Sequence, residues 1–526
     1  NIKSVKDKRM SRYMFDGYFK HFLHFVQQYC LAIAVNVKKR WKYLLLLWLV
    51  VLAIYVYLGG SIIFIPKTLL IITGLIGSLA VCVDGKIHNK VCTMIILMGS
   101  IFAFITPVLD APDETAHYSR ALYISEGHLY LPNKPKEFQV SKDVVIADKV
   151  MKTPLIKSGL DKVRTSSDKA YYPKFVATNA SSFVPYLPQV VGILIAKILG
   201  LSVFASIILG RLSNLIVYSL LVRLAIKKSN GKELLFSTIA MIPMAVYLAS
   251  SFSTDGMANG LIFLLLGTFC SLIDQNKVDM KDISIFASLC LLMATIKLPY
   301  VLIVGLLLFI PKNKFKSRHT YLYIITAIVF VAIISFLWLR LSSGINITQV
   351  NDVANPVEKL KYTFAHLKTF SLFSFKEIIN LIPNLLPSLF TFGWLSYGLG
   401  NLMWFYLPFI ACIIFMIPQY NPLPTFSKFG TLLVGFGITL GILMTAYLMW
   451  GKVTEMSFNG IQGRYFIGVI LLMGLALNVS HFYVPTPVVL TNEEEERRDS
   501  LVLFIALLFI IMSIVLTILE YYGVKA

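Results

Sequence analysis

Long apolar runs follow one another along most of this chain and decide what it can fold into. Three of them, Tyr43–Ile65, Val203–Ile226 and Tyr321–Leu341, each match the length of a helix that crosses a bilayer. Composition agrees, because 57% of the 526 residues are hydrophobic and the mean hydropathy is +0.74. We therefore expect an all-α, multi-pass membrane protein in contact with the lipid bilayer.

Counting these runs predicts a bundle of about 13 transmembrane helices. Three spans are expected within residues 43–107, six within 203–341 and four within 403–526. A Lys beside a Pro separates two short runs and predicts a helix broken near Lys297. The expected spans are Tyr43–Ile65, Leu69–Val83, Val91–Pro107, Val203–Ile226, Leu234–Ser251, Met257–Ile273, Ile283–Thr295, Val301–Ile310, Tyr321–Leu341, Met403–Pro418, Gly430–Trp450, Arg464–Asn478 and Leu501–Tyr522.

The basic residues indicate which way the chain crosses the membrane. The formal net charge is +21, and Lys and Arg cluster in short segments between apolar runs, which is the positive-inside pattern and not that of a nucleic-acid-binding protein. Residues 1–42 then form a cytoplasmic, interfacial basic segment, and Asn492–Arg498 a cytoplasmic turn. The six cysteines form no Cys-x-x-Cys pair, so neither a disulfide framework nor a zinc site is predicted.

Two stretches fall outside the membrane in this count. Residues 108–202 form a large extracytoplasmic loop after the third span, in which Tyr186–Leu201 is a helix that lies on the membrane or dips into it. Residues 342–402 form a second loop, and its Ile378–Trp394 portion is apolar enough for a re-entrant or surface helix. If residues 186–201 cross the membrane instead, everything after them inverts.

Ionisable residues are concentrated immediately after the third span, in Asp110–Arg120. Pro112 suits the first turn of a helix, and Asp110 is placed to cap it. On such a helix Asp113, His117 and Arg120 share one face, and Glu114 points to a neighbouring face. The stretch is either a site or a capped helix start with surface salt bridges.

Polar residues inside or at the edges of spans are costly, so each is a candidate site residue. Arg211 lies well inside a span, with Asn214 one turn away. The alternative explanations are structural: pairing of Arg211 with a carboxylate, helix capping by Asp255, and extension of Lys297 toward water. Arg464 opens a span on the outer side, where Arg-Tyr pairs also serve as interfacial anchors.

An ordered set of short motifs resembles one known family. The set is Pro-Asp-Glu-x-x-His-x-x-Arg-Ala at 112–121, Tyr-Leu-Pro-Gln at 186–189, Gly-Arg-Leu-x-Asn at 210–214, Ser-x-Ser-x-Asp-Gly at 251–256, Lys-x-Pro-Tyr at 297–300 and Gln-Gly-Arg-Tyr-Phe at 462–466. It is similar to the bacterial membrane proteins filed as domain of unknown function 2142. The resemblance runs from about residue 100 to about residue 480 and departs at Thr115, where a second Pro is expected.

That family is grouped with the GT-C glycosyltransferases, which use sugars linked to polyprenyl phosphate. The resemblance implies an acidic catalytic base in the first outer loop, which maps onto Asp113 or Glu114. As a hypothesis, Arg464 and Lys297 hold the donor phosphate on the outer face of the cytoplasmic membrane, with support from Arg120 or Arg211. A one-step displacement toward a cell-envelope glycan or a lipid-linked acceptor then inverts the anomeric configuration.

Further candidates around this site are Asp255, Asn214, Gln462 and Tyr300. We expect His117 to orient the carboxylate. Asp113 and His117 alone are too few ligands to predict a metal, and no cofactor is predicted.

Two other functions fit the same features. In a carrier or flippase for lipid-linked saccharides, the intramembrane charges line a pathway and Asp113 is a gate. A polysaccharide polymerase or ligase also has many spans and outer-face cations, but it takes a donor linked to a lipid diphosphate. Competition between donors distinguishes the polymerase from the transferase.

Overall fold

The computed structural model describes residues 35–57, 64–132, 137–315, 317–343, 356–398, 400–449, 452–458, 460–478 and 491–523. The basic segment expected at residues 1–42 lies almost wholly outside this part of the chain. The described fold is helical, apart from two small two-stranded sheets.

Seven of the described helices are long and apolar enough to cross a membrane. They are α3 (Phe64–Cys82), α4 (Ile87–Ile105), α8 (Val203–Lys228), α11 (Thr254–Asp274), α13 (Arg318–Ser343), α17 (Thr425–Met449) and α20 (Asn492–Tyr522). Shorter apolar elements stand among them, namely α2 (Trp41–Tyr57), α12 (Met280–Ala294), η6 (Leu298–Phe309), α16 (Met403–Phe415), η9 (Gly463–Phe466) and α18 (Ile467–Ala476). The chain is therefore a multi-pass membrane protein, and the number of about 13 spans stays a prediction.

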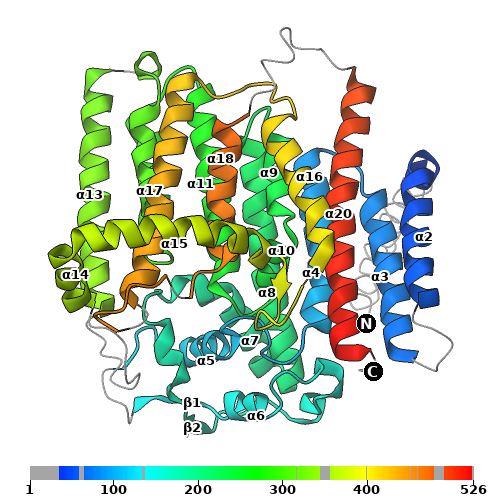
Figure 1. Ribbon diagram of the computed structural model, residues 1–526. Coiled ribbons are helices and arrows are strands. Elements are labelled where there is room, and N and C mark those ends of the chain that lie inside the picture. The colour runs from blue at the N-terminus through cyan, green and yellow to red at the C-terminus, as the bar shows by residue number, and fades with distance from the viewer. Residues whose placement is uncertain are drawn as a thin grey trace, which may run out of the picture.

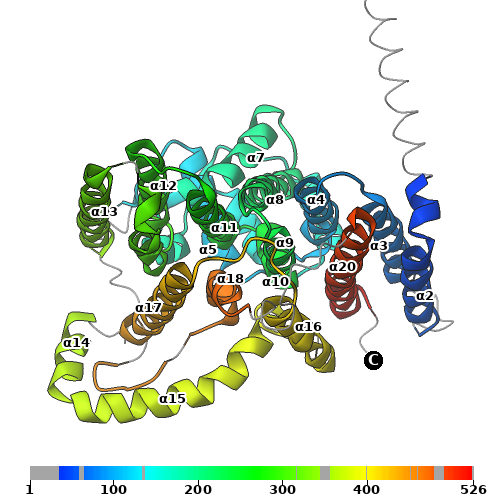
Figure 2. The ribbon, with the colours of Figure 1, turned by 90° about the horizontal axis from the view of Figure 1, so that it is seen from above.

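The long helices stand side by side in one bundle (Figure 1). Seen from above, α13 and α2 lie at opposite ends of the bundle, and α8, α11 and α4 lie between them (Figure 2). One continuous apolar core joins these helices, with α9, α10 and α18 at its centre. In a bilayer this close packing substitutes for the hydrophobic collapse of a soluble core.

Three expected boundaries were wrong. The span expected at Leu234–Ser251 is two helices, α9 (Glu233–Ala240) and α10 (Pro243–Ala249), because Pro243 cannot continue the hydrogen-bonding of α9. The first span ends at Tyr57 and α3 begins at Phe64, so the expected end at Ile65 belongs to the next helix. The expected turn at Asn492–Arg498 is the start of α20, which Thr491 caps.

The break predicted at Lys297 is confirmed. α12 ends at Ala294 and the 3₁₀ helix η6 begins at Leu298, with Lys297 as its first flanking residue. Lys297 therefore sits where the helical backbone is interrupted, between two apolar elements.

The stretch after α4 folds against one end of the bundle. It contains α5 (Glu114–Ser125), α6 (Asp143–Lys149), α7 (Leu187–Ile198), several 3₁₀ turns and a hairpin of β1 (Gln139–Ser141) with β2 (Lys169–Tyr171). The strands are antiparallel, with Val140 opposite Ala170. These elements share a second apolar cluster separate from the bundle core, so this stretch is a packed unit (Figure 1).

A second set of elements follows α13 and precedes α16 in the sequence. α14 (Pro356–Ala365) leads into α15 (Leu367–Ser388), which runs across the bundle, roughly perpendicular to α17 (Figure 1). The expected apolar segment Ile378–Trp394 is therefore the end of α15 followed by a short pairing of β3 (Thr391–Phe392) with β4 (Tyr397–Gly398).

Helices from the two ends of the chain pack together beside α4. α20 packs closely against α3, because a Cβ added to Gly77 of α3 would lie only 3.0 Å from Ile511 of α20. α20 also contacts α2, where the ring centroids of Tyr43 and Phe504 are 4.8 Å apart. Lys39 forms an ion pair with Glu496 at 2.7 Å. α2, α3 and α20 thus form one group at the edge of the bundle (Figure 2).

The charged loops separate into two ends of the bundle. Lys86, Lys227 and Arg498, from three segments expected to be cytoplasmic, line one cavity of about 630 Å³. α5 and the β1–β2 hairpin lie at the opposite end (Figure 1). This separation is what the positive-inside pattern requires, and which end faces the cytoplasm stays a prediction.

Candidate functional site

The turn before α5 differs from the expected helix start. The helix begins at Glu114, and Asp113 precedes it with a left-handed backbone (φ 60°) and no capping hydrogen bond from its side chain. Pro112 lies outside the helix, and the Asp110 carboxylate accepts a hydrogen bond from Tyr521 instead of capping. A non-glycine residue at positive φ is strained by about 1 kcal/mol or more, and such positions cluster at functional sites.

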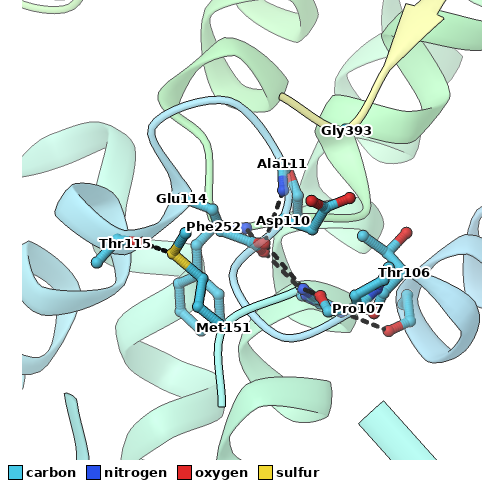
Figure 3. A network of polar contacts seen from close by, with 12 residues as sticks. Thr106, Pro107, Asp110, Ala111, Glu114, Thr115, Met151, Phe252 and Gly393 are labelled. Atoms are coloured by element: carbon cyan, nitrogen blue, oxygen red, sulfur yellow. Dashed lines mark hydrogen bonds and ion pairs between the residues drawn. The ribbon is translucent and has the colours of Figure 1, made fainter. Parts of the chain in front are cut away.

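Glu114 turns inward from this helix and is fully buried, with 0% of its side chain exposed. Its two oxygens accept from Nε and Nη2 of Arg211, both at 2.9 Å. The backbone N–H groups of Phe252 and Ala111 donate to the same carboxylate, at 2.9 and 3.2 Å (Figure 3). These four contacts give the buried Glu114 carboxylate both a counter-charge and hydrogen bonds, which a buried charge requires.

Arg211 is equally saturated. Besides Glu114, its guanidinium donates to the carbonyl oxygens of Ala103, Thr106 and Pro107 at 2.8 to 3.1 Å. These carbonyls lie at the end of α4, where a helix leaves acceptors without partners. The structural alternative for Arg211, pairing with a carboxylate in the bundle, is the arrangement present here.

The same layer fixes the turn that starts α11. Asn214 donates to the carbonyls of Ser251 and Ser253 at 3.0 and 3.2 Å, and Gln189 donates to that of Ser253 at 2.9 Å. Ser253 in turn caps α11 by accepting from the Asp255 N–H at 3.1 Å. Side chains from α7 and α8 thus hold the turn that positions Asp255.

A network of four charges lies next to this layer. Arg464 donates from Nη2 to Asp113 at 3.0 Å, and its Nη1 lies 3.5 Å from Asp255 Oδ2. Lys297 binds the other oxygen of Asp255 at 2.8 Å. Two cations and two carboxylates therefore meet, from α11, from η9 and from the residues just before α5 and η6, although Asp113 and Arg464 are 351 residues apart in the sequence.

Exposure differs sharply within the network. Asp113 is 54% exposed, whereas the Arg464, Asp255 and Lys297 side chains are 4, 9 and 16% exposed. The three buried members are two cations and one carboxylate, so the half-exposed Asp113 carboxylate is needed to balance their charge. Asp113 is the member that faces outward.

Two neighbouring elements hold Arg464 in place. Gly463 donates its N–H to Ser388 at the end of α15, and a Cβ on Gly463 would lie only 2.3 Å from the Leu385 carbonyl oxygen, so only glycine fits there. Tyr300 donates to the Tyr465 carbonyl at 2.6 Å. The aromatic ring of Tyr465 also lies 4.9 Å from the Lys297 ammonium.

Gln462 precedes this segment. Its side-chain oxygen is buried and has no hydrogen-bond partner among the described residues. Sequence reasoning singled out Tyr300 and Gln462 but missed Ser388, since nothing in the sequence shows that the end of α15 reaches η9.

His117 and Arg120 lie farther along α5 and contact other groups. His117 Nδ1 is 2.8 Å from the Tyr186 hydroxyl, and burial lowers its pKa while Asp113 and Asp255 oppose that shift. Arg120 is buried and donates from Nη2 to the Leu129 carbonyl at 2.8 Å. The His117 N–H does donate to the Asp113 carbonyl at 3.1 Å, but no hydrogen bond or ion pair joins the side chains of these three described residues.

Asp110 is a buried carboxylate that sequence reasoning treated only as a cap. Burial raises its pKa to about 6, against a hydrogen bond from Tyr521 that lowers it. In Figure 3 its carboxylate turns toward Gly393 and away from Glu114. Its partner comes from the last helix of the chain, which no local pattern reveals.

Seven of the predicted site residues thus fall into two groups. The structure brings Asp113, Asp255, Lys297 and Arg464 together, and it places Glu114, Arg211 and Asn214 in the supporting layer. The cavity of about 630 Å³ lies at the other end and contains none of them. Among the described residues, no three His, Cys, Asp or Glu side chains are grouped as metal ligands.

These features define the class: a multi-pass membrane protein with a charge network where the packed stretch after α4 meets the helix bundle. Residues 96–473 match the family described as predicted membrane protein DUF2142, and the chain belongs to that family. No curated protein and no solved structure matches the chain. The matched region includes the whole charge network and its supporting layer, and α2, α3 and α20 lie outside it.

Proposed function

We propose that this protein is an integral membrane glycosyltransferase of the GT-C type. It moves a sugar from a polyprenyl-phosphate donor to a cell-envelope glycan or lipid-linked acceptor, on the outer face of the bacterial cytoplasmic membrane. The observation that carries the proposal is the half-exposed Asp113 carboxylate bound to the buried Arg464 guanidinium. That pair combines a base that a substrate can reach with a cation suited to a phosphate.

Asp113 is the base in this mechanism, and Glu114 is not. Glu114 has no exposed surface, and its oxygens already accept from Arg211 and two backbone N–H groups. Asp113 makes one contact with Arg464 and is 54% exposed. A base must come within hydrogen-bond reach of the proton it removes, which only Asp113 can do here.

Arg464 and Lys297 receive the donor phosphate. In the free protein their charges are matched by Asp113 and Asp255. A phosphate at Arg464 takes over the guanidinium contact of Asp113 and leaves that carboxylate free to act. Donor binding therefore releases the Asp113 carboxylate to act as the base.

Transfer proceeds by one displacement at the anomeric carbon. The acceptor oxygen forms a bond to that carbon as Asp113 takes the hydroxyl proton, and the bond from the carbon to the phosphate oxygen breaks. Polyprenyl phosphate leaves with the electron pair, stabilised by Arg464 and Lys297, and the configuration inverts. General-base catalysis of this kind contributes about 10²–10⁴-fold.

The test measures sugar transfer in membranes from cells that lack the chromosomal copy. Polyprenyl-phosphate sugar made in those cells is labelled, and label in the envelope glycan is measured after complementation with wild type or Asp113→Asn. We expect the variant to lose transfer by about 10²–10⁴-fold at matched abundance of folded protein. Asp161→Asn, an exposed carboxylate of the same extramembrane region, is the matched control and keeps full transfer.

Two outcomes would overturn the proposal. Full transfer by Asp113→Asn removes the catalytic role of this carboxylate. Loss of lipid-linked saccharide from the outer leaflet, with normal transfer in opened membranes, supports a flippase instead.

A further inference from the structure

Arg120 is a buried cation without a counter-charge. Its side chain lies in α5 and the residue is 2% exposed. Nη2 donates to the Leu129 carbonyl, whereas Nε and Nη1 have no hydrogen-bond partner among the described residues. No carboxylate among the described residues lies within ion-pair distance of the Arg120 guanidinium.

This arrangement contrasts with that of the other buried arginine nearby. Arg211 uses every N–H group and pairs with Glu114. Burying a charged group without such compensation costs several kcal/mol, so a buried guanidinium of this kind implies a partner that the described residues do not supply.

Arg120 lines a small cavity of about 30 Å³. The lining is mostly apolar and includes Trp338 of α13, and its polar residues besides Arg120 are Tyr130, Asn179, Ser181, Ser182 and Ser342. Tyr130, also in the lining, is 66% exposed, so the cavity opens to the outside. A cavity of this size holds about one or two atoms the size of a water oxygen, so an oxyanion enters it with one or two of its oxygens while the rest of the molecule extends outward.

The cavity wall continues into the segment that carries Lys297. Ser182 donates from its N–H to the Thr295 carbonyl at 2.8 Å and from its hydroxyl to Thr295 Oγ1 at 3.0 Å. Ser181 donates to the Ile296 carbonyl at 3.3 Å. Arg120 follows Asp113 by seven residues, or about 10 Å along a helix axis, so the cavity and the charge network are close enough for one extended molecule to contact both.

We propose that this cavity binds a carboxylate or phosphate group of the glycan acceptor. Arg presents several fixed N–H donors and is the residue best suited to oxyanions. The polar side chains at the wall and the aromatic rings of Tyr130 and Trp338 suit the adjoining sugar. Assignment of the ligand to the acceptor rests on the proposed function, but the anion site itself does not require Asp113.

The test is binding to the purified full-length protein in nanodiscs of zwitterionic lipid. Glucuronate and glycerol phosphate are the probes, and glucose is the neutral control. We expect the two anions to raise Tm by about 2–4 °C at saturation and glucose to leave it unchanged. Arg120→Gln should lose this shift and weaken binding at least about tenfold, the loss of one charge-assisted contact.

A matched variant and a second readout keep the result interpretable. Arg164→Gln removes an exposed arginine that also contacts one backbone carbonyl, that of Gly200, and should keep the shift. Without anion, Arg120→Gln should unfold no earlier than wild type, because it removes an uncompensated charge. An early unfolding of Arg120→Gln together with no anion response in wild type would overturn the site.

Two further arms separate the sources of the anion. If nanodiscs with anionic phospholipid already give the full shift and glucuronate adds nothing, the ligand is a lipid headgroup and the acceptor assignment falls. Anion binding is also measured with Asp113→Asn. Retained binding by this variant with full transfer would overturn the transferase while leaving the anion site in place.

Discussion

Asp113 and Glu114 are adjacent carboxylates with opposite surroundings. Glu114 is enclosed by Arg211 and two backbone N–H groups, whereas Asp113 is half exposed and shares Arg464 with Asp255. The left-handed backbone at Asp113 turns the two side chains to opposite sides. The Glu114–Arg211 pair therefore stabilises the fold around the site, whereas the Asp113–Arg464 pair is accessible to a substrate.

Breaking the enclosed pair gives the largest expected effect on stability. Arg211→Met leaves the Glu114 carboxylate buried without its counter-charge, which destabilises the fold by about 3–5 kcal/mol. We expect little folded protein in detergent extracts, measured by size-exclusion chromatography and thermal unfolding.

The double variant Glu114→Gln with Arg211→Met is the control. It leaves no buried charge and should recover part of the lost stability. A single Arg211→Met variant as stable as wild type would show that the pair contributes nothing to the fold.

A smaller effect is expected at Asp110, which is buried like Glu114 but forms no ion pair with any of the described residues. The folded state binds its proton more tightly than the unfolded state does, since the pKa rises from 3.8 to about 6. The stabilisation is therefore complete below about pH 4 and is lost as the pH rises to about 6. At pH 7.5, the free energy of unfolding of Asp110→Asn should exceed that of wild type by about 1–3 kcal/mol. The variant should therefore unfold at a higher temperature.

The measurement is the difference in Tm between Asp110→Asn and wild type from pH 4.5 to pH 8. It should grow as the pH rises. A difference that does not depend on pH would mean that Asp110 titrates normally.

The smallest effect on stability is expected for Asp113→Asn, although it removes the proposed base. A half-exposed ion pair contributes about 0–1 kcal/mol. Thermal unfolding of the purified variant should thus match wild type closely. A large fall in Tm would place Asp113 with Glu114, as a structural residue.

Much of the bundle was predictable because single runs of sequence encode it. α4, α8, α11, α13, α17 and α20 each cover an expected span, since about 20 apolar residues leave few alternatives in a bilayer. The division of Leu234–Ser251 was missed because the apolar run continues through Pro243. Short strands such as β3 also escaped, since two residues carry no periodicity.

The candidate site was predictable as a set of residues and not as a set of pairs. Burial cost alone singles out Arg211, Lys297 and Arg464, because charged groups are rare inside spans. Their partners depend on which helices pack together, and Glu114 lies 97 residues from Arg211. Helix periodicity gave the wrong grouping, because it placed Asp113 on one face with His117 and Arg120. Asp113 lies outside the helix and binds Arg464 instead.

The group formed by α2, α3 and α20 lies outside the family match and draws on both flanks of the chain. Its helices contact each other through Gly77 and Ile511 and through Lys39 and Glu496, and α20 also reaches Asp110 through Tyr521. The two flanks consequently depend on each other for their packing. Trimming either flank alone would expose the apolar side of the other, so neither is separable from the fold by itself.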